Sequence, residues 1–245
     1  MRVLRFDSGV AEYFDDMVVD DVLVRIRVNG VPLSEMMAYE EYLDEFIVGY
    51  LKTSNLIHGV GDIQSVNWTN YTVDVQLRDG FDPVIHKERW LSILEHAYRD
   101  EELEIDGNEG LDFVSPDQVF HAMKLLNDSC TIFSQTGGTH SSLIYHSDLG
   151  YVFAEDVGRF NALDKVVGLA LDSGFNLSES MLVTSGRLSG EMVLKAACAG
   201  VPVMCSVSAP MCSGVCIAQA AGMTLIGFVR GDRFNVYSGF RRISS

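Results

Sequence analysis

Four short polar clusters in the second half of the chain combine glycine with side chains that could bind an anion. They read SQTGGTH (134–140), EDVGRFNALDK (155–165), TSGRLSGE (184–191) and SVSAP (206–210). Glycine lets the backbone approach a ligand closely, while serine, arginine and lysine donate hydrogen bonds to phosphate-like oxygens. Each cluster falls where a strand is predicted to end or a helix to begin, so together they favour a binding crevice over ordinary turns. The candidate ligand-binding residues are Gly137, Gly138, His140, Glu155, Asp156, Gly158, Arg159, Asn161, Asp164, Lys165, Ser185, Gly186, Arg187, Ser206, Ser208, Ala209 and Pro210.

The stretch 181–213 is the centre of this prediction. Apolar runs over 182–183 and 201–205 predict two strands, and helical spacing from Leu188 to Gly200 predicts a helix between them. A second helix is expected to open at Ser208-Ala209-Pro210. Parallel strands joined by a helix place helix N-termini at the carboxyl ends of neighbouring strands. Open α/β sheets bind ligands there, and helix N-termini favour anions.

All five cysteines lie in the second half, at 130, 198, 205, 212 and 216. Their odd number and irregular spacing argue against a disulfide framework. Cys198 and Cys205 fall inside apolar elements and are predicted to pack in the core. Cys212, near a helix N-terminus, could act as a nucleophile or sulfur carrier. Alternatively, it could simply pack against Cys216, one helical turn away.

A zinc site of the deaminase type is a further alternative. Zinc deaminases place H-x-E at one helix start and P-C-x-x-C at the next. Here Cys212 and Cys216 are separated by three residues, and Ser185-Gly186-Arg187 offers neither histidine nor glutamate. Only His140 could complete the ligand set, so we expect no metal. A hydrolase triad is also disfavoured, because no G-x-S-x-G is present.

The charge of the chain is strongly asymmetric. The net charge is −16, of which residues 1–115 carry −15 and residues 116–245 carry −1. An acidic protein is a poor ligand for nucleic acid, because affinity there depends on neutralising phosphates. The acidic half could serve solubility alone or deflect anions towards the second half. No apolar run reaches the roughly 20 residues of a membrane span, and no signal peptide is recognisable, so we expect a soluble cytoplasmic protein.

Two domains are predicted, both within an α/β fold class. Residues 1–115 predict a smaller, acidic α+β domain, with hairpins around Asn29-Gly30 and Thr69-Asn70 and an amphipathic helix over 40–53. A further helix over 87–98 and an acidic linker over 100–113 are expected to follow. Helix and strand alternate throughout residues 116–245, which predicts a three-layer α/β domain.

The polar clusters make the chain resemble the FdhD family of formate dehydrogenase accessory sulfurtransferases. The similarity rests on TGGTH at 136–140, EDVGR at 155–159, Asn161-Ala162 with Asp164-Lys165, SGR at 185–187, SVSAP at 206–210, GFVR at 227–230 and FNVY at 234–237, and more weakly on 28–30, 45–51 and Ile57. The resemblance implies a cytidine-deaminase-like C-terminal domain without zinc, and a homodimer. It also implies binding of the molybdenum guanine dinucleotide cofactor, or of GDP in its place. A cysteine desulfurase would supply sulfur, and formate dehydrogenase would receive the cofactor.

The chain departs from the family pattern at the sulfur-carrying position. The family carries sulfur on a Cys-x-x-Cys loop, where this chain has the cysteine-free stretch 101–115; Phe160 also stands where histidine is usual. Three hypotheses therefore stay open. The protein could transfer sulfur through another thiol, Cys212 or Cys216, or through a partner. It could instead bind and deliver the cofactor without catalysis, or be a zinc hydrolase or deaminase of the same fold.

Overall fold

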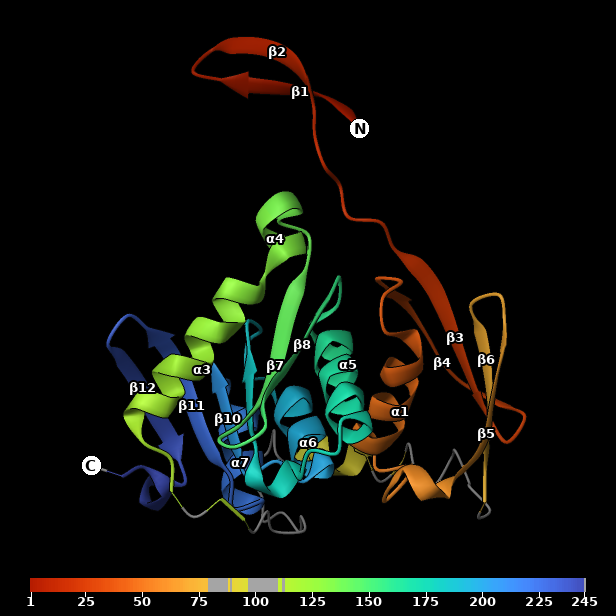
Figure 1. Ribbon diagram of the computed structural model, residues 1–245, viewed down its shortest axis with the longest axis vertical. Helices are drawn as coiled ribbons and strands as arrows, with labels where there is room; N and C mark the ends of the chain where they lie inside the picture. Colours follow the sequence, from red (N-terminus) through yellow and green to blue (C-terminus); the bar gives the residue numbers. More distant parts are fainter. Residues whose placement is uncertain (79–87, 89, 97–109, 112, 245) are drawn as a thin grey trace.

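The computed structural model of the protein describes residues 1–78, 88, 90–96, 110–111 and 113–244 (Figure 1). Helices and strands mix in both halves, and the predicted α/β class is confirmed. The strands form a six-stranded sheet in the second half, a four-stranded sheet in the first half and a two-stranded ribbon at the N-terminus. Most of the linker predicted over 100–113 and part of the helix predicted over 87–98 lie outside the described residues.

The six-stranded sheet has the order β12-β11-β10-β9-β7-β8. Its strands are β7 (His140–His146), β8 (Gly150–Asp156), β9 (Met181–Thr184), β10 (Val203–Ser206), β11 (Thr224–Arg230) and β12 (Arg233–Ser238). Strands β9, β10 and β11 are parallel, as the stretch 181–213 predicts, whereas β7, β8 and β12 run antiparallel to their neighbours. The carboxyl ends of β8 to β11 therefore meet the beginning of β7 at one edge of the sheet.

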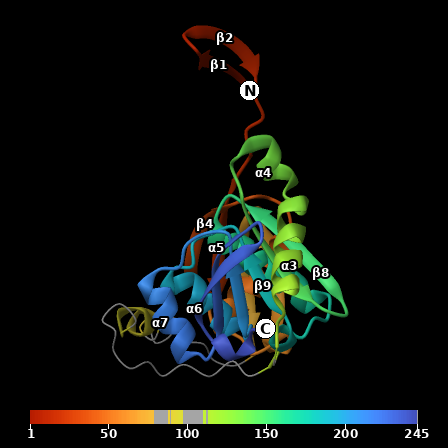
Figure 2. The same ribbon diagram turned by 90° about the vertical axis from the view of Figure 1, so that its left-hand side faces the viewer.

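Helices cover both faces of this sheet, which gives three layers. They are α3 (Pro116–Ser129), α4 (Thr131–Thr136), α5 (Arg159–Asp172), α6 (Gly190–Ala199) and α7 (Cys212–Ala220). Neighbouring side chains of β9 point to opposite faces of the sheet. Leu182 belongs to the core cluster with α5, α6 and α7, whereas Val183 belongs to the cluster with α3. Figure 2 shows α3 on one side of the sheet and α6 and α7 on the other.

Local signals explain some helix boundaries, and tertiary contacts explain others. Ser115 and Gln118 form a reciprocal capping box that starts α3. The helices expected to open at Leu188 and at 208–210 begin later, at Gly190 and Cys212. Leu188 and Pro210 form a parallel bridge, in which the Leu188 N–H donates to Ala209 and the Leu188 carbonyl accepts from Met211. This bridge keeps both segments extended for two more residues.

Residues 22–77 of the first half form a four-stranded sheet that packs against helix α1. Its elements are β3 (Val22–Val28), β4 (Val31–Ala38), α1 (Leu43–Thr53), β5 (Ile63–Thr69) and β6 (Thr72–Leu77), with strand order β4-β3-β6-β5. Both predicted hairpins are confirmed, and Pro32 lies on the edge strand β4, where a missing N–H costs little. The N-terminal ribbon of β1 (Arg2–Asp7) and β2 (Val10–Asp15) is not predicted from the sequence. The described residues also include three short 3-10 helices, Val60–Asp62, Leu177–Glu179 and Phe240–Arg242.

The two halves meet where α1 crosses α5. A Cβ placed on Gly49 would lie 1.7 Å from the carbonyl oxygen of Asp164, and one on Gly168 would lie 1.9 Å from that of Glu45. The helices therefore touch backbone to backbone, which only glycine permits. The helical segment 90–96 also packs Trp90, Ile93 and Leu94 against the core of the second half. The domain boundary at residue 115 stays a prediction.

Candidate functional site

Strand pairing brings the four polar clusters to one edge of the large sheet. His140, at the start of β7, pairs with Asp156, at the end of β8. Thr184, at the end of β9, pairs with Ser142 of β7 and with Ser206 of β10. The loops that follow β8, β9 and β10 therefore lie beside the loop that precedes β7. This edge of the sheet is the place of the predicted binding crevice, and we keep the name crevice for its four loops, 137–140, 156–159, 185–189 and 207–211.

Serine hydroxyls hold these loops together. The Ser208 Oγ donates to the Ser185 carbonyl at 2.9 Å, and the Ser206 Oγ donates to the Gly186 carbonyl at 2.6 Å. The Ser185 Oγ lies 3.3 Å from the His140 Nδ1. Three of the four clusters are thus joined by direct hydrogen bonds, which fixes their relative positions in advance of any ligand.

The N-termini of α6 and α7 also open at the crevice, side by side. The Gly190 N–H, in the first turn of α6, donates to the Ser213 Oγ in the first turn of α7 at 3.2 Å. The first turn of a helix carries backbone N–H groups without partners in the helix and the positive end of the helix dipole, so two such ends side by side favour an anion. The predicted juxtaposition of two helix N-termini is confirmed.

Two arginines add positive charge. Arg187 is exposed, whereas Arg159 is half-buried with its stem 3.2 Å from the Cβ position of Gly186. Burial, followed by the charges of Arg159 and Arg187, lowers the pKa of His140 below its ordinary value. His140 is therefore a neutral hydrogen-bonding group near neutral pH, and the two guanidinium groups supply the cationic charge.

Two buried polar atoms of the crevice have no hydrogen-bond partner among the residues that the structure describes. They are the Arg159 Nε and the Ser189 Oγ. Ser189 is 8% exposed and is the N-cap of α6, but its hydroxyl caps no N–H of that helix. Buried polar groups are normally satisfied, so both atoms suit a ligand oxygen. Ser189 is not among the residues predicted from the sequence, although a serine just before a helix is an N-cap signal that points to it.

Another group of candidate residues joins the two halves of the protein. Asp156 pairs with Lys165 at 2.8 Å and accepts from the Tyr39 N–H at 3.0 Å, while the Lys165 Nζ donates to the Tyr39 carbonyl at 2.6 Å. The Asn161 Nδ2 donates to Asp156 at 2.8 Å and to the Met37 carbonyl at 2.7 Å. All three candidates are buried, with their polar groups engaged inside the protein.

A second buried network surrounds Asp164, the residue before Lys165 in α5. Lys195 donates to both carboxylate oxygens of Asp164 at 3.0 Å, and the Thr53 Oγ donates to the same carboxylate at 2.5 Å. Glu155 has a comparable internal role, because it accepts from the Ile132 and Phe133 N–H groups at the start of α4. Asp164 and Glu155 therefore stabilise the segments next to the crevice through internal hydrogen bonds. Direct contact of these residues with a ligand stays a prediction.

The cysteines differ in accessibility. Cys205 is fully buried, as predicted for a core residue, and burial raises its pKa. Cys130 and Cys198 are half-buried, and burial raises the pKa of Cys130. Cys212 is exposed at the first position of α7, next to the crevice, and Cys216 is half-buried one turn later. Of the five thiols, Cys212 is the most accessible to a partner.

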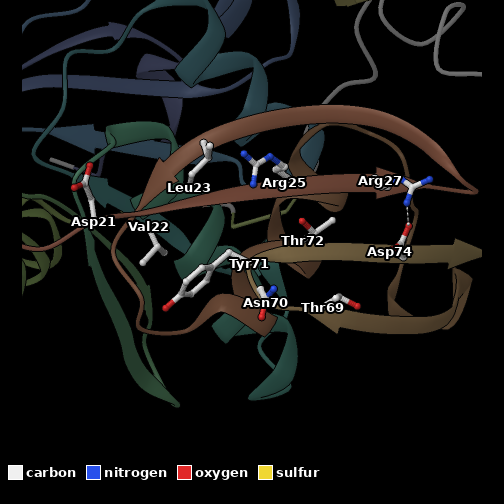
Figure 3. Close-up of a pocket in the computed structure, with 10 residues that line it drawn as sticks. All are labelled: Asp21, Val22, Leu23, Arg25, Arg27, Thr69, Asn70, Tyr71, Thr72 and Asp74. Atoms are coloured by element: carbon white, nitrogen blue, oxygen red, sulfur yellow. Dashed lines mark ion pairs between the residues drawn. The ribbon is translucent and has the colours of Figure 1, made fainter.

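A separate hollow lies on the outer face of the four-stranded sheet (Figure 3). It encloses about 690 Å³ and is lined by β3, β6 and the turn between β5 and β6. Its two arginines are already paired, Arg27 with Asp74 at 3.3 Å and Arg25 with Glu35 at 3.3 Å. Because these charges are compensated, the hollow is less suited to an anion than the crevice.

Within the described part of the chain, no group of three or more His, Cys, Asp or Glu side chains is arranged to hold a metal ion. The 185–189 loop of the crevice carries Ser185 and Arg187, which donate hydrogen bonds, and a metal site would need histidine, cysteine or carboxylate ligands. Among the same residues, no helix has the length and apolarity required to cross a membrane.

Fold and site together define an α/β protein with an anion-favouring crevice at a sheet edge, supported by a second, smaller sheet unit. The model of the FdhD/NarQ family matches residues 19–244, so the chain belongs to this family, as its motifs predict. The sulfur carrier protein FdhD of Methanothermobacter thermautotrophicus is 38% identical over 229 residues, which cover 93% of this chain and 92% of that protein. That of Listeria innocua is 31% identical over 255 residues, covering 99% and 97%.

A solved structure supports the fold. The crystal structure of a protein from Desulfotalea psychrophila, described as a formate dehydrogenase accessory protein, superposes with a TM-score of 0.81. The match covers 100% of this chain and 98% of that one, at 24% sequence identity. At this identity, the likeness establishes the shared architecture.

Proposed function

We propose that this protein is an accessory factor for formate dehydrogenase that binds the molybdenum guanine dinucleotide cofactor and supports its sulfuration. Family membership supports the general role, because the curated relatives are named sulfur carrier proteins. The single observation that carries the ligand assignment is the pair of buried donors without partners, the Arg159 Nε and the Ser189 Oγ, beside the N-termini of α6 and α7. We further propose that the protein acts as a cytoplasmic homodimer.

The residues of the crevice fit a guanine dinucleotide. Its phosphates need several donors and positive charge, which Arg159, Arg187, Ser189 and the backbone N–H groups of the α6 N-terminus provide. Gly137 and Gly138 are exposed and lack side chains that would keep a ligand away from the backbone. When bound, the cofactor supplies the molybdenum centre that receives sulfur. The chain's own task is to hold the phosphates and orient the cofactor.

Cys212 is the proposed sulfur carrier of this chain, because it is the exposed thiol beside the crevice. Its thiolate would attack the terminal sulfur of a persulfide on a cysteine desulfurase. The new S–S bond forms on Cys212, the old S–S bond breaks, and the desulfurase cysteine leaves as a thiolate. No external oxidant is required, because the transferred sulfur is already in the persulfide state.

Mass spectrometry after incubation with a cysteine desulfurase and cysteine tests this step. We expect one added sulfur atom on Cys212, lost in Cys212→Ser and retained in Cys216→Ser, the matched control one turn away. Absence of added sulfur from all five cysteines would refute the carrier function.

A second function, cofactor binding and delivery without sulfur transfer, is favoured by one observation. The stretch 101–115 holds no cysteine, although the family's sulfur-carrying loop is expected there. Both functions require nucleotide binding, so we expect saturating GDP to raise the melting temperature and Arg187→Ala to abolish the increase. An unchanged melting temperature would contradict both; a GDP-induced increase without sulfur loading would favour delivery.

A further inference from the structure

Arg159 and Phe160, the first two residues of α5, are in contact through their side chains. The Arg159 guanidinium carbon lies 4.4 Å from the centre of the Phe160 ring. A cation at this distance over an aromatic face is attracted by the negative face of the ring. Phe160 is half-buried and packs against the core cluster with α5, α6 and α7, so the ring is anchored in the fold.

The stem of the Arg159 side chain packs against the 185–189 loop. A Cβ placed on Gly186 would lie 3.2 Å from the Arg159 Cβ and 3.3 Å from its Cδ, so the glycine lets the stem lie close to the loop backbone. That backbone is itself fixed, because the Gly186 N–H donates to the Thr184 Oγ1 at 3.2 Å and the Gly186 carbonyl accepts from the Ser206 Oγ at 2.6 Å.

The Nε of Arg159 is bonded to both of the held atoms, Cδ beside Gly186 and the guanidinium carbon over Phe160. We call these two contacts the clamp. The Nε is buried and has no hydrogen-bond partner among the residues that the structure describes. An Nε–H and a neighbouring Nη–H form a fork that matches two oxygens of a phosphate. The charge also reaches His140 in the neighbouring loop, where it is, after burial, the next cause that lowers the pKa of that histidine.

We propose that Phe160 is a positioning residue, whose ring holds the Arg159 guanidinium so that its Nε–H stays available for a phosphate oxygen of the ligand. The inference rests on the nucleotide binding of the proposed function and names a residue on which the affinity depends. A free arginine loses side-chain entropy when a ligand orders it. The clamp removes this cost before the ligand arrives, so binding is stronger.

Isothermal titration calorimetry with GDP, at a fixed salt concentration, tests the positioning role. Phe160→Leu keeps an apolar side chain but removes the ring, and should raise the dissociation constant for GDP about threefold to tenfold. Phe160→Tyr keeps the ring and should restore binding to within about twofold of the wild type. Phe153→Leu is the matched control, because it makes the same exchange at a half-buried ring of β8 that packs against the cluster with α3. This control should bind GDP like the wild type.

A double-mutant cycle separates positioning from packing alone. Arg159→Gln removes the charge and the Nε–H, and should weaken GDP binding at least about tenfold. In this background, Phe160→Leu should have less than about a twofold further effect, because no guanidinium is left to hold. A ring that served only packing would weaken binding by the same factor in both backgrounds. Arg159→Lys leaves Phe160 in place and keeps the charge but lacks the fork, so it should weaken binding at least about threefold.

Several results would overturn the positioning role. Unchanged GDP affinity in Phe160→Leu would do so, as would equal effects of this substitution in both backgrounds or equal weakening by Phe153→Leu. Wild-type affinity in Arg159→Lys would show that the Nε–H is not the donor, and this result does not depend on how well Phe160→Leu folds. All these outcomes leave GDP binding by the wild type intact. A wild-type chain that does not bind GDP would instead contradict the proposed function, and the positioning role with it.

Discussion

Substitution of Gly49 by alanine tests the contact that joins the two halves. Gly49 lies within α1, where alanine is intrinsically more favourable than glycine by about 1 kcal/mol. Helix propensity alone therefore predicts a more stable protein. The structure predicts the opposite, because the new Cβ would lie 1.7 Å from the Asp164 carbonyl oxygen and 2.8 Å from the Gly168 nitrogen. Both obstacles are backbone atoms, so no side-chain rotation can relieve the clash.

The magnitude follows from the competition between these effects. Helices α1 and α5 must separate by more than 1 Å to restore ordinary contact, and overpacking of this kind costs about 3 kcal/mol. After the gain in propensity of about 1 kcal/mol, the free energy of unfolding should fall by about 2 kcal/mol. For a chain of 245 residues, this corresponds to a decrease in melting temperature of about 4–8 °C.

Equilibrium unfolding in urea, followed by circular dichroism, measures this change. Gly61→Ala is the control, because a Cβ at Gly61 meets no atom within 4 Å and its backbone lies outside the left-handed region. The control should change stability by less than about 0.5 kcal/mol. A Gly49→Ala protein that is as stable as the wild type, or more stable, would refute the backbone contact between α1 and α5.

Two further predictions concern charged groups. Asp164→Asn leaves the Lys195 ammonium buried without its anion, so the free energy of unfolding measured by urea titration should fall by about 3–5 kcal/mol. Asp128→Asn, in the exposed pair with Lys124, is the control and should change the free energy of unfolding by less than about 1 kcal/mol. Similar effects of the two substitutions would contradict the buried network. The lowered pKa of His140 means that the unfolded chain binds the proton more readily, so stability should fall as the pH drops through the ordinary value of 6.5 towards the lower folded-state pKa. His140→Gln should flatten the part of the stability profile that lies at and below about pH 6.5, and an unchanged profile would contradict the shift.

The sequence by itself determined most of the local structure and the family. Alternation of apolar residues identified β3, Asn29-Gly30 fixed its hairpin, and Ser115-Pro116 marked the start of α3. These signals are readable because each depends on neighbouring residues. The order of the polar clusters along the chain likewise predicted that they meet at one sheet edge, since parallel strands share their carboxyl ends.

Only the tertiary structure separated the residues that line the crevice from those that support it. Asp164 and Lys165 belong to the same sequence cluster as Arg159, yet their charges are satisfied by groups of other segments, such as Lys195 and the Tyr39 carbonyl. Lys165 and Tyr39 are 126 residues apart, so no local pattern can reveal their pairing. Burial decides the roles of these residues, because a charge removed from water must find its partner within the fold, wherever in the sequence that partner lies.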